Sequence, residues 1–282
     1  MKNINQLVNH VKIKILTNIK SVVERKLNKY ELNVKISVKE KLILERNKYL
    51  NDRHKNEPAF VIANGPSLAK LNLSKLDKYI KFTMSGFWKH EILKEWQPNY
   101  YCLIDKTFFK KSEPIIEFYH NLQNNIRATY LLPLMQGKNF IEENKLLDNG
   151  EKYYFLTYGN DGAENFSGKL RGFQSVATFA LANAVNMGCS PIYLIGYDHD
   201  FLVNRGMAQH FYQGAIISGH WSSNLREDQF SSYYSEMKSV MRLWDDYFFI
   251  KKFADSKKIK IYNATENSYL DIFERICFDD VP

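Results

Sequence analysis

Phe60-Val61-Ile62-Ala63-Asn64-Gly65-Pro66-Ser67-Leu68 is an apolar run that leads directly into a turn and then into a helical pattern. An apolar run bounded by glycine and proline is typical of a buried parallel strand. Gly65 allows a sharp turn, Pro66 fits the first turn of a helix, and Ser67 can cap that helix. Backbone N–H groups at such a junction can bind an anion. The stretch therefore predicts an α/β fold and a candidate phosphate site, although any strand–turn–helix junction shares this pattern.

From residue 58 onward, strand patterns alternate with helical patterns. Such alternation indicates βαβ units that build a mainly parallel sheet with helices on both faces, which is a Rossmann-like α/β fold. Ligands bind such sheets at the carboxyl ends of the strands. The expected strands are 59–63, 81–85, 100–104, 128–132, 153–157, 191–197 and 259–263, and the expected helices are 67–78, 88–96, 111–123, 139–147, 173–187 and 231–256.

The net charge of +8 lies entirely in one segment of the chain. Residues 1–57 hold 14 Lys and Arg against 6 Asp and Glu, whereas residues 58–282 hold 25 of each kind. We therefore predict two parts, a basic helical extension over 1–57 and a neutral α/β domain over 58–282. A neutral domain argues against nucleic acid as a partner, because nucleic-acid binding requires a basic face.

Within the basic extension, apolar residues recur at three- and four-residue steps from Ile4 to Tyr30, which predicts an amphipathic helix. This helix can pack on the body or on a second subunit, which would make a homo-oligomer. Alternatively, it can rest on an anionic lipid surface. No apolar run approaches the ~20 residues that span a bilayer, and three isolated cysteines suit a reducing compartment. We expect a cytoplasmic protein, with a peripheral position on the inner face of the membrane as the alternative.

A second strand–helix junction strengthens the case for an anion site. Gly172-Phe173-Gln174-Ser175 opens a strongly apolar helix, and the strand after it ends in Gly196-Tyr197-Asp198. The N-terminus of a buried helix can hold an anion. Two such sites at strand ends suggest a nucleotide, with base or ribose at one site and phosphate at the other.

Three of the seven histidines, His199, His210 and His220, lie within 22 residues after this strand. They fall in the stretch from about 199 to 230, which has no clear period and is long enough to be a functional lid. Histidine titrates near neutral pH, so the cluster favours a general base, although surface or capping roles also fit. Walker-type GxxxxGK[ST], GxGxxG and GxSxG motifs are absent, which disfavours ATPases, NAD enzymes and serine hydrolases.

Asp198-x-Asp200 matches the carboxylate pair with which many sugar-nucleotide transferases hold a divalent metal. A pair of this kind is common by chance, and Asp198 can equally orient a histidine or cap a loop. We expect no required metal, with Mg²⁺ or Mn²⁺ as the alternative. A zinc site with His199 and His210 is weaker still, because no cysteine lies nearby.

Several motifs together resemble two related families. The helix start at Asn64–Leu68, the Ser175 helix with the following Ile192–Asp198, and a downstream histidine resemble the bacterial sialyltransferases of glycosyltransferase family 42. The chain is closer still to the polysaccharide-locus proteins grouped with the 6-hydroxymethylpterin diphosphokinase-like family. The motifs similar to that family are Gly196–Phe201, His210–Tyr212, Tyr262-Asn263-Ala264-Thr265 and Phe273-Glu274-Arg275. The resemblance covers roughly residues 58 to 278.

The resemblance implies a Rossmann-like fold of the variant GT-A type and metal-independent transfer from a CMP-activated sugar. Asn64 would contact the nucleotide and Ser175 the donor, while His210, or else His220, would be the general base. Tyr212 would stabilise the leaving phosphate, because Phe201 stands where the family has a tyrosine. Asp198 would orient the histidine or a ribose hydroxyl. The remaining donor-site candidates are Gly65, Pro66, Ser67, Ser85, Asp105, Gln174, Gly196 and His199, with Ser85 and Asp105 standing where the family has asparagine.

We therefore expect an inverting glycosyltransferase that moves a sialic-acid-like or other acidic keto-sugar to a glycan acceptor in surface polysaccharide or lipooligosaccharide synthesis. A lipid-linked acceptor would suit the basic extension. The alternatives are a metal-dependent NDP-sugar glycosyltransferase, an ATP- and magnesium-dependent pterin diphosphokinase, and a non-catalytic scaffold.

Overall fold

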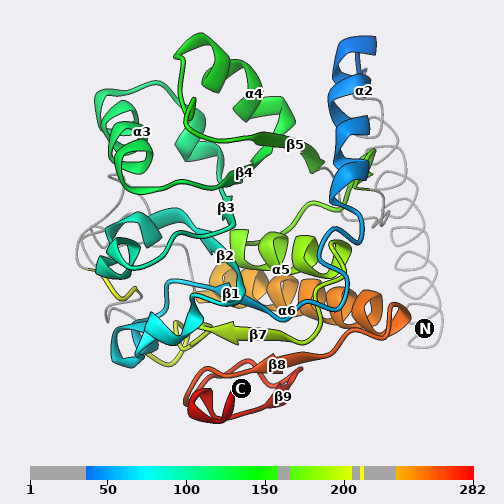
Figure 1. Cartoon of the computed structure of the whole chain (residues 1–282). Coiled ribbons are helices and arrows are strands. Elements are labelled where there is room, and N and C mark those ends of the chain that lie inside the picture. The colour runs from blue at the N-terminus through cyan, green and yellow to red at the C-terminus, as the bar shows by residue number, and fades with distance from the viewer. Residues whose placement is uncertain (1–35, 158–165, 205–209, 213–232) are drawn as a thin grey trace, which may run out of the picture.

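The computed structural model describes residues 36–157, 166–204, 210–212 and 233–282 (Figure 1). The described strands form one sheet in the order β6-β5-β4-β3-β2-β1-β7-β8-β9, and every pairing in it is parallel. The predicted Rossmann-like fold with a mainly parallel sheet is therefore confirmed. The strands are β1 Ala59–Ile62, β2 Ile80–Met84, β3 Tyr100–Cys102, β4 Thr129–Pro133, β5 Lys152–Thr157, β6 Lys169–Leu170, β7 Ile192–Ile195, β8 Ile261–Asn263 and β9 Glu274–Arg275.

Helices cover both faces of the sheet (Figure 1). Alternate strand residues point to opposite faces, so Val61 packs against α5 Val176–Asn186 and α6 Tyr233–Ser256. Phe60 and Ile62 lie on the other face, which α3 Glu113–Asn125 and α4 Leu134–Glu143 cover. Both faces are buried, which explains why the strands read as continuous apolar runs rather than as alternating ones.

Two of the predicted helices are wrong in type. The ranges 67–78 and 88–96 contain short 3₁₀ helices, at Pro66–Lys70, Leu73–Leu76, Ser85–Lys89 and Glu91–Lys94. The Asn72 side chain accepts a hydrogen bond from the Ser74 N–H at 3.1 Å, and His90 Nδ1 accepts one from the Ile92 N–H at 3.1 Å. Such local bonds compete with a continuous helical ladder and divide each range in two.

Other differences concern single elements. The predicted helix 139–147 starts earlier, at Leu134, and ends at Glu143. The two-residue edge strands β6 and β9 and a 3₁₀ helix at Lys106–Phe109 were not predicted. Elements this short carry no periodicity that a sequence pattern could reveal.

Part of the predicted extension packs on the sheet domain. It forms α2 Val38–Glu45 and a 3₁₀ helix at Arg46–Leu50. Leu44 and Leu50 are buried, and Asn47 Nδ2 donates to the Tyr154 carbonyl oxygen at 2.9 Å. The predicted amphipathic helix from Ile4 to Tyr30 lies outside the described residues.

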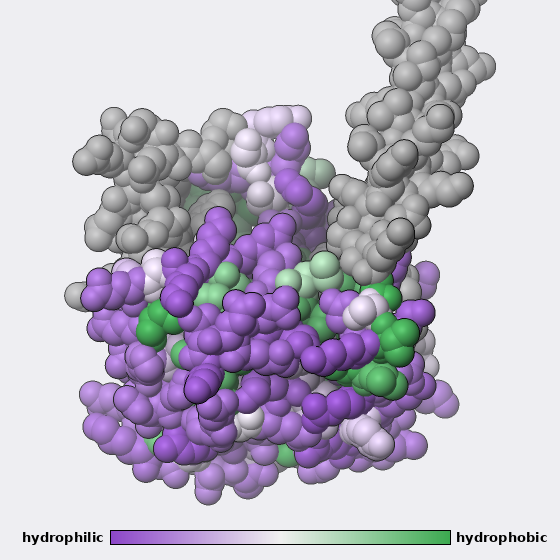
Figure 2. Space-filling model, turned by 90° about the horizontal axis from the view of Figure 1, so that it is seen from above, coloured by the Kyte–Doolittle hydropathy of each residue, from purple (hydrophilic) through white to green (hydrophobic). Residues whose placement is uncertain are grey.

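The surface seen from above is mostly hydrophilic, with small separate hydrophobic patches (Figure 2). Exposed apolar side chains on and just after α2 are Val38, Leu42 and Tyr49. No described helix is both long enough and apolar enough to cross a bilayer.

Candidate active site

The order of strands reverses direction at β1. The chain moves from β1 outward through β2, β3, β4, β5 and β6, and then returns to place β7 on the opposite side of β1. In open parallel sheets, ligands bind in the crevice outside the carboxyl ends of the strands at such a switch point. Asn64 and Asp198 follow β1 and β7 at this edge, so the structure places the two predicted motifs side by side.

Ser67 and Asp198 join the two strand ends. The Ser67 N–H donates to Asp198 Oδ1 at 2.9 Å, and the Ser67 hydroxyl donates to Oδ2 at 2.7 Å. Burial raises the pKa of the Asp198 carboxyl, although both hydrogen bonds from Ser67 act in the opposite direction. The backbone N–H that we expected to face a phosphate therefore binds a carboxylate of this chain, and Ser67 does not cap the helix.

Two glycines make this approach possible. The Gly65 N–H donates to the Gly196 carbonyl oxygen at 2.9 Å, and Gly196 has a φ of +71°. A Cβ added at Gly65 would lie 1.8 Å from Asp198 Oδ2. Gly65 itself is the N-cap of the 3₁₀ helix, and Pro66 is its first residue, as expected for proline.

Asn64 lies at the centre of the switch point. Its Nδ2 donates to the Met84 carbonyl oxygen at 3.1 Å, which ties the end of β1 to the end of β2. Its Oδ1 is buried and has no hydrogen-bond partner among the described residues. Asn47 and Asn183 also have a buried Oδ1 without a partner among the described residues, so it is the place of Asn64 at the ligand edge that indicates a site for a ligand donor.

The predicted catalytic segment His210–Tyr212 docks on this edge. The Phe211 N–H donates to the Asn64 carbonyl oxygen at 2.9 Å, and the Phe211 ring lies 5.0 Å from the His90 ring. Tyr212 packs against Gly86, where an added Cβ would lie 2.3 Å from the tyrosine ring. Burial raises the pKa of the Tyr212 hydroxyl, so the phenol is protonated at neutral pH and can donate a hydrogen bond.

His210 itself is exposed and stacks on Tyr212, with ring centroids 5.0 Å apart. Ser85, which the sequence placed in the donor site, follows β2 with a φ of +48°. A positive φ is uncommon for a residue with a Cβ and occurs often at functional sites. His220, the second candidate base, lies outside the described residues.

His199 does not face the switch point as a free base. Its Nε2 is 2.7 Å from the Tyr247 hydroxyl, and the rings of Tyr197, Phe201 and Trp244 surround it. Burial lowers the pKa of His199 to about 4, so the ring is neutral at pH 7. His199 therefore anchors α6 to the loop after β7, which is a structural role that its place in the sequence did not reveal.

Three other predicted residues form hydrogen bonds with groups of this chain. Asp105 Oδ1 accepts from the Thr107 N–H at 2.8 Å and caps the 3₁₀ helix after β3. Ser175 caps α5, because its hydroxyl accepts from the Thr178 N–H at 3.2 Å. The Gln174 N–H donates to Asp246 Oδ2 at 2.6 Å. At the start of α5, the N–H groups of Ser175 and Thr178 are thus bound by groups of the chain itself.

The Asp198-x-Asp200 pair makes separate contacts. Asp198 binds Ser67, whereas Asp200 Oδ2 accepts from Asn204 Nδ2 at 2.7 Å. In the part of the chain that the structure describes, no group of three or more His, Cys, Asp or Glu side chains could hold a metal ion. A third protein ligand for these two carboxylates is therefore not found within those residues.

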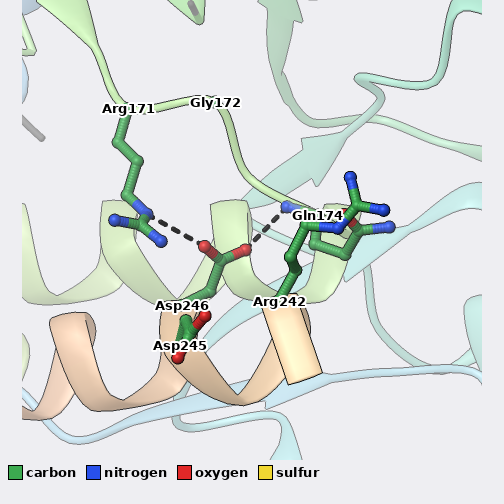
Figure 3. A pocket seen from close by; sticks show the side chains of 6 residues that line it. All are labelled: Arg171, Gly172, Gln174, Arg242, Asp245 and Asp246. Atoms are coloured by element: carbon green, nitrogen blue, oxygen red, sulfur yellow. Dashed lines mark hydrogen bonds and ion pairs between the residues drawn. The ribbon is translucent and has the colours of Figure 1, made fainter. Parts of the chain in front are cut away.

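A polar cavity of about 340 Å³ beside the N-terminus of α5 was not predicted (Figure 3). Its lining residues are Arg171, Gly172, Gln174, Arg242, Asp245 and Asp246. Asp246 is buried among Leu243, Tyr247 and Ile250 on the apolar side of α6. A carboxylate on the apolar face of a predicted helix is the sequence signal that could have indicated this cavity.

An all-parallel sheet with helices on both faces and a polar ligand edge at its switch point defines a Rossmann-like α/β protein. Residues 27–204 match the 6-hydroxymethylpterin diphosphokinase MptE-like family, and the chain belongs to this family. The resemblance to this family is therefore confirmed. The match begins inside the predicted extension and ends just after the Gly196–Phe201 motif.

Similar solved structures include three glycosyltransferases. The MAf glycosyltransferase from Magnetospirillum magneticum AMB-1 is 12% identical, with 86% of this chain and 39% of that chain covered and a TM-score of 0.46. The Campylobacter jejuni sialyltransferase CstII, in complex with the substrate analogue CMP-3FNeuAc, is 15% identical, with 78% and 86% covered and a TM-score of 0.47. The monofunctional α-2,3-sialyltransferase Cst-I from Campylobacter jejuni is 14% identical, with 77% and 79% covered and a TM-score of 0.45.

This chain thus spans well under half of the length of the MAf protein. Similarity at this level carries no information about the reaction or its residues. No curated protein matches the chain.

Proposed function

We propose that this protein is an inverting glycosyltransferase that moves a sialic-acid-like or other acidic keto-sugar from a CMP-activated donor to a glycan acceptor. The reaction would belong to surface polysaccharide or lipooligosaccharide synthesis. The nucleotide lies at the carboxyl ends of β1, β2 and β7, near Asn64, Ser85 and Asp198. The resemblance to family 42 sialyltransferases and the location of the switch point both support this placement.

The observation that carries the proposal is the buried Oδ1 of Asn64, which lies at the switch point and has no hydrogen-bond partner in the described part of the chain. Leaving a buried polar atom unpaired costs about 1–3 kcal/mol, which a ligand donor would recover. A cytidine nucleotide offers such donors in its exocyclic amine and its ribose hydroxyls. Asn64 also holds Phe211 through its carbonyl oxygen at 2.9 Å, so nucleotide binding and the placement of His210 would be linked.

The chemistry needs one base and one site for the leaving group. The acceptor hydroxyl oxygen forms a bond to the anomeric carbon of the donor while the bond from that carbon to the phosphate oxygen breaks. His210 takes the acceptor proton, and CMP leaves with the bonding electron pair. The protonated hydroxyl of Tyr212 is positioned by Gly86 to donate to the leaving phosphate. Because a single phosphate leaves, this reaction needs no metal to bridge a diphosphate.

The acceptor in this proposal is a lipid-linked glycan at the inner face of the membrane, with the protein otherwise in the cytoplasm. The support is the charge distribution, because residues 1–57 carry the whole net charge of +8 and residues 1–35 alone hold 8 Lys and Arg against 2 Asp and Glu. A chain that starts at residue 36 should lose its affinity for anionic vesicles. If it sediments with such vesicles as the full chain does, the membrane role of residues 1–35 is wrong.

The nucleotide site can be tested by thermal unfolding with CMP in the absence of metal. A ligand that binds only the folded state stabilises it by about 2.7 kcal/mol at a hundredfold excess over its Kd. CMP should raise the Tm of the native chain but not that of Asn64→Ala. The matched control is Asn183→Ala, because Asn183 on α5 is also buried and its Oδ1 also lacks a partner among the residues that the structure describes. If CMP leaves the native Tm unchanged, or raises the Tm of Asn64→Ala equally, the proposed site is wrong.

A second candidate is the diphosphoryl transfer after which the family is named. That reaction would use ATP and Mg²⁺, with Asp198 and Asp200 as candidate ligands. A metal-dependent NDP-sugar transferase would use the same pair. Stabilisation only by ATP or a nucleoside diphosphate with Mg²⁺ or Mn²⁺ would favour these candidates over the CMP donor. Turnover of ATP with 6-hydroxymethylpterin would then identify the diphosphokinase.

A further inference from the structure

Hydrogen bonds between lining residues hold one wall of the polar cavity beside α5 in place (Figure 3). Arg171 Nε donates to Asp246 Oδ1 at 2.9 Å, and the Gln174 N–H donates to Oδ2 at 2.6 Å. The side chain of Asp246 is 2% exposed and that of Arg171 is 16% exposed. These bonds join α6 to the loop that leads into α5. This wall is therefore formed before any ligand binds, because Arg171 and Asp246 already pair with each other.

The cavity lies on the ligand edge of the sheet. The helix α5 connects β6 to the parallel strand β7, so its N-terminus is at the carboxyl ends of the strands. The Tyr197 hydroxyl donates to the Ala177 carbonyl oxygen in the first turn of α5 at 3.2 Å. Tyr247, which follows Asp246, contacts His199, which follows Asp198. The cavity and the switch point are thus neighbours, with the rings of Tyr197, His199 and Tyr247 between them.

The lining favours a neutral polyhydroxylated ligand. All six lining residues are polar or glycine, so the cavity offers no aromatic side chain on which a base or a pterin ring could stack. Arg171 is neutralised by Asp246, and the exposed Arg242 and Asp245 bring one charge of each sign. A volume of about 340 Å³ is at the low end of small-molecule sites. Guanidinium, amide and carboxylate groups together supply the donors and acceptors that sugar hydroxyls require.

We infer that this cavity is a subsite for a neutral sugar unit of the acceptor glycan, next to the sugar that reacts. The inference rests on the proposed glycosyl transfer. A lining of balanced charge does not suit the carboxylate of an acidic donor sugar, so the donor is not its ligand. Gln174, Arg242 and Asp245 would contact the sugar. Asp246 would hold Gln174 in position without contacting the sugar.

The test uses saturation-transfer NMR on the full chain without nucleotide, with glucose, galactose, N-acetylglucosamine and lactose as probes. At least one probe should bind with a Kd of the order of 1 mM, and Arg242→Ala and Asp245→Asn should each weaken it about tenfold. Matched controls on the same helix are Lys252→Ala and Asp255→Asn, which are exposed and outside the cavity, and these should bind as the native chain does. The inference would be overturned if no probe binds, or if the two cavity variants bind the probe as tightly as the native chain does. It would also be overturned if the acidic sugar N-acetylneuraminate binds the native chain more tightly than the neutral probes do.

Thermal shift with CMP on the same variants separates this inference from the proposed function. The CMP shift should be unchanged in Arg242→Ala and Asp245→Asn, because the cavity does not hold the nucleotide. Loss of the CMP shift in these variants would overturn the inference by placing the cavity in the donor site. If the native chain binds a neutral sugar through Arg242 and Asp245 but does not bind CMP, the sugar subsite holds and the CMP donor is wrong.

Discussion

Ser67 and Asp198 are 131 residues apart in the sequence, yet the Asp198 carboxylate accepts both the N–H and the hydroxyl of Ser67, at 2.9 and 2.7 Å. The pair joins the ends of β1 and β7 at the point where ligands bind sheets of this type. Hydrogen bonds to a charged acceptor are the stronger kind. The Asp198 carboxylate therefore fixes the shape of the switch point, and within the described residues the Oδ1 of Asn64 is a buried polar atom there that has no partner.

Gly65→Ala should disrupt this arrangement. The added Cβ would lie 1.8 Å from Asp198 Oδ2 and 2.5 Å from the Gly196 carbonyl oxygen, so backbone has to move. Overpacking of this kind costs about 1–3 kcal/mol, and occasionally more. Urea unfolding measures the change. Gly137→Ala in α4 is the control, because its nearest neighbours are side-chain atoms at 3.2 Å and alanine favours a helix by about 0.5–1 kcal/mol. Equal unfolding midpoints for both variants would contradict the prediction.

The fold and the edge that carries the site were predictable from the sequence. Phe60 to Ile62 and Ile192 to Ile195 are continuous apolar runs, as expected for strands of a parallel sheet with both faces covered. Since parallel strand ends meet at one edge, Asn64 and Asp198 could be placed there before any coordinates were known. The expected helix at 67–78 failed because Asn72 bonds the Ser74 N–H locally, an effect that periodicity does not report.

The roles of individual site residues were less predictable. Whether the Ser67 N–H faces a phosphate or the Asp198 carboxylate depends on a long-range contact that no local pattern contains. His199 was predicted as a site residue, but its backbone has a φ of +54° and its ring packs against the rings of Trp244 and Tyr247. Residues 205–209 and 213–232 of the expected lid lie outside the described residues, so the lid stays a prediction.

His210→Gln should abolish most of the transferase activity while leaving the protein stable. General base catalysis contributes about 10²–10⁴-fold, so kcat should fall by that factor. The Tm should not change, because His210 is exposed and contributes little to the core. Initial rates with a CMP-activated donor measure the effect, and His120→Gln, an exposed histidine on α3, is the control. A rate within about twofold of the native value would exclude His210 as the base and leave His220 as the candidate.

Asp246→Ala should be among the most destabilising changes on α6. Removing one partner of a buried ion pair costs about 3–5 kcal/mol, and in this variant the half-buried Arg171 loses the carboxylate that accepts from its Nε. The double variant Arg171→Met/Asp246→Leu should recover part of this loss, since no buried charge is left. Chemical denaturation gives the free energies of unfolding. Glu151→Ala, which breaks the exposed pair with Arg46, should cost under about 1 kcal/mol. A strictly additive double variant would show that the pair is not coupled.

His199 should make stability depend on pH in acid solution. Its pKa is lowered from 6.5 to about 4 by burial, so the folded state holds the neutral ring. The stabilisation is complete above pH 6.5 and is lost as the pH falls toward 4, because the unfolded chain binds a proton that the folded chain does not. Within this window the free energy of unfolding of the native chain should fall by up to about 1.4 kcal/mol per pH unit relative to His199→Asn.

Asparagine is the replacement of choice because it tolerates a positive φ. Unfolding curves at several pH values, with His120→Gln as the control, measure the difference. Parallel curves for the native chain and His199→Asn between pH 6.5 and 4 would show that the ring is not held neutral in the fold.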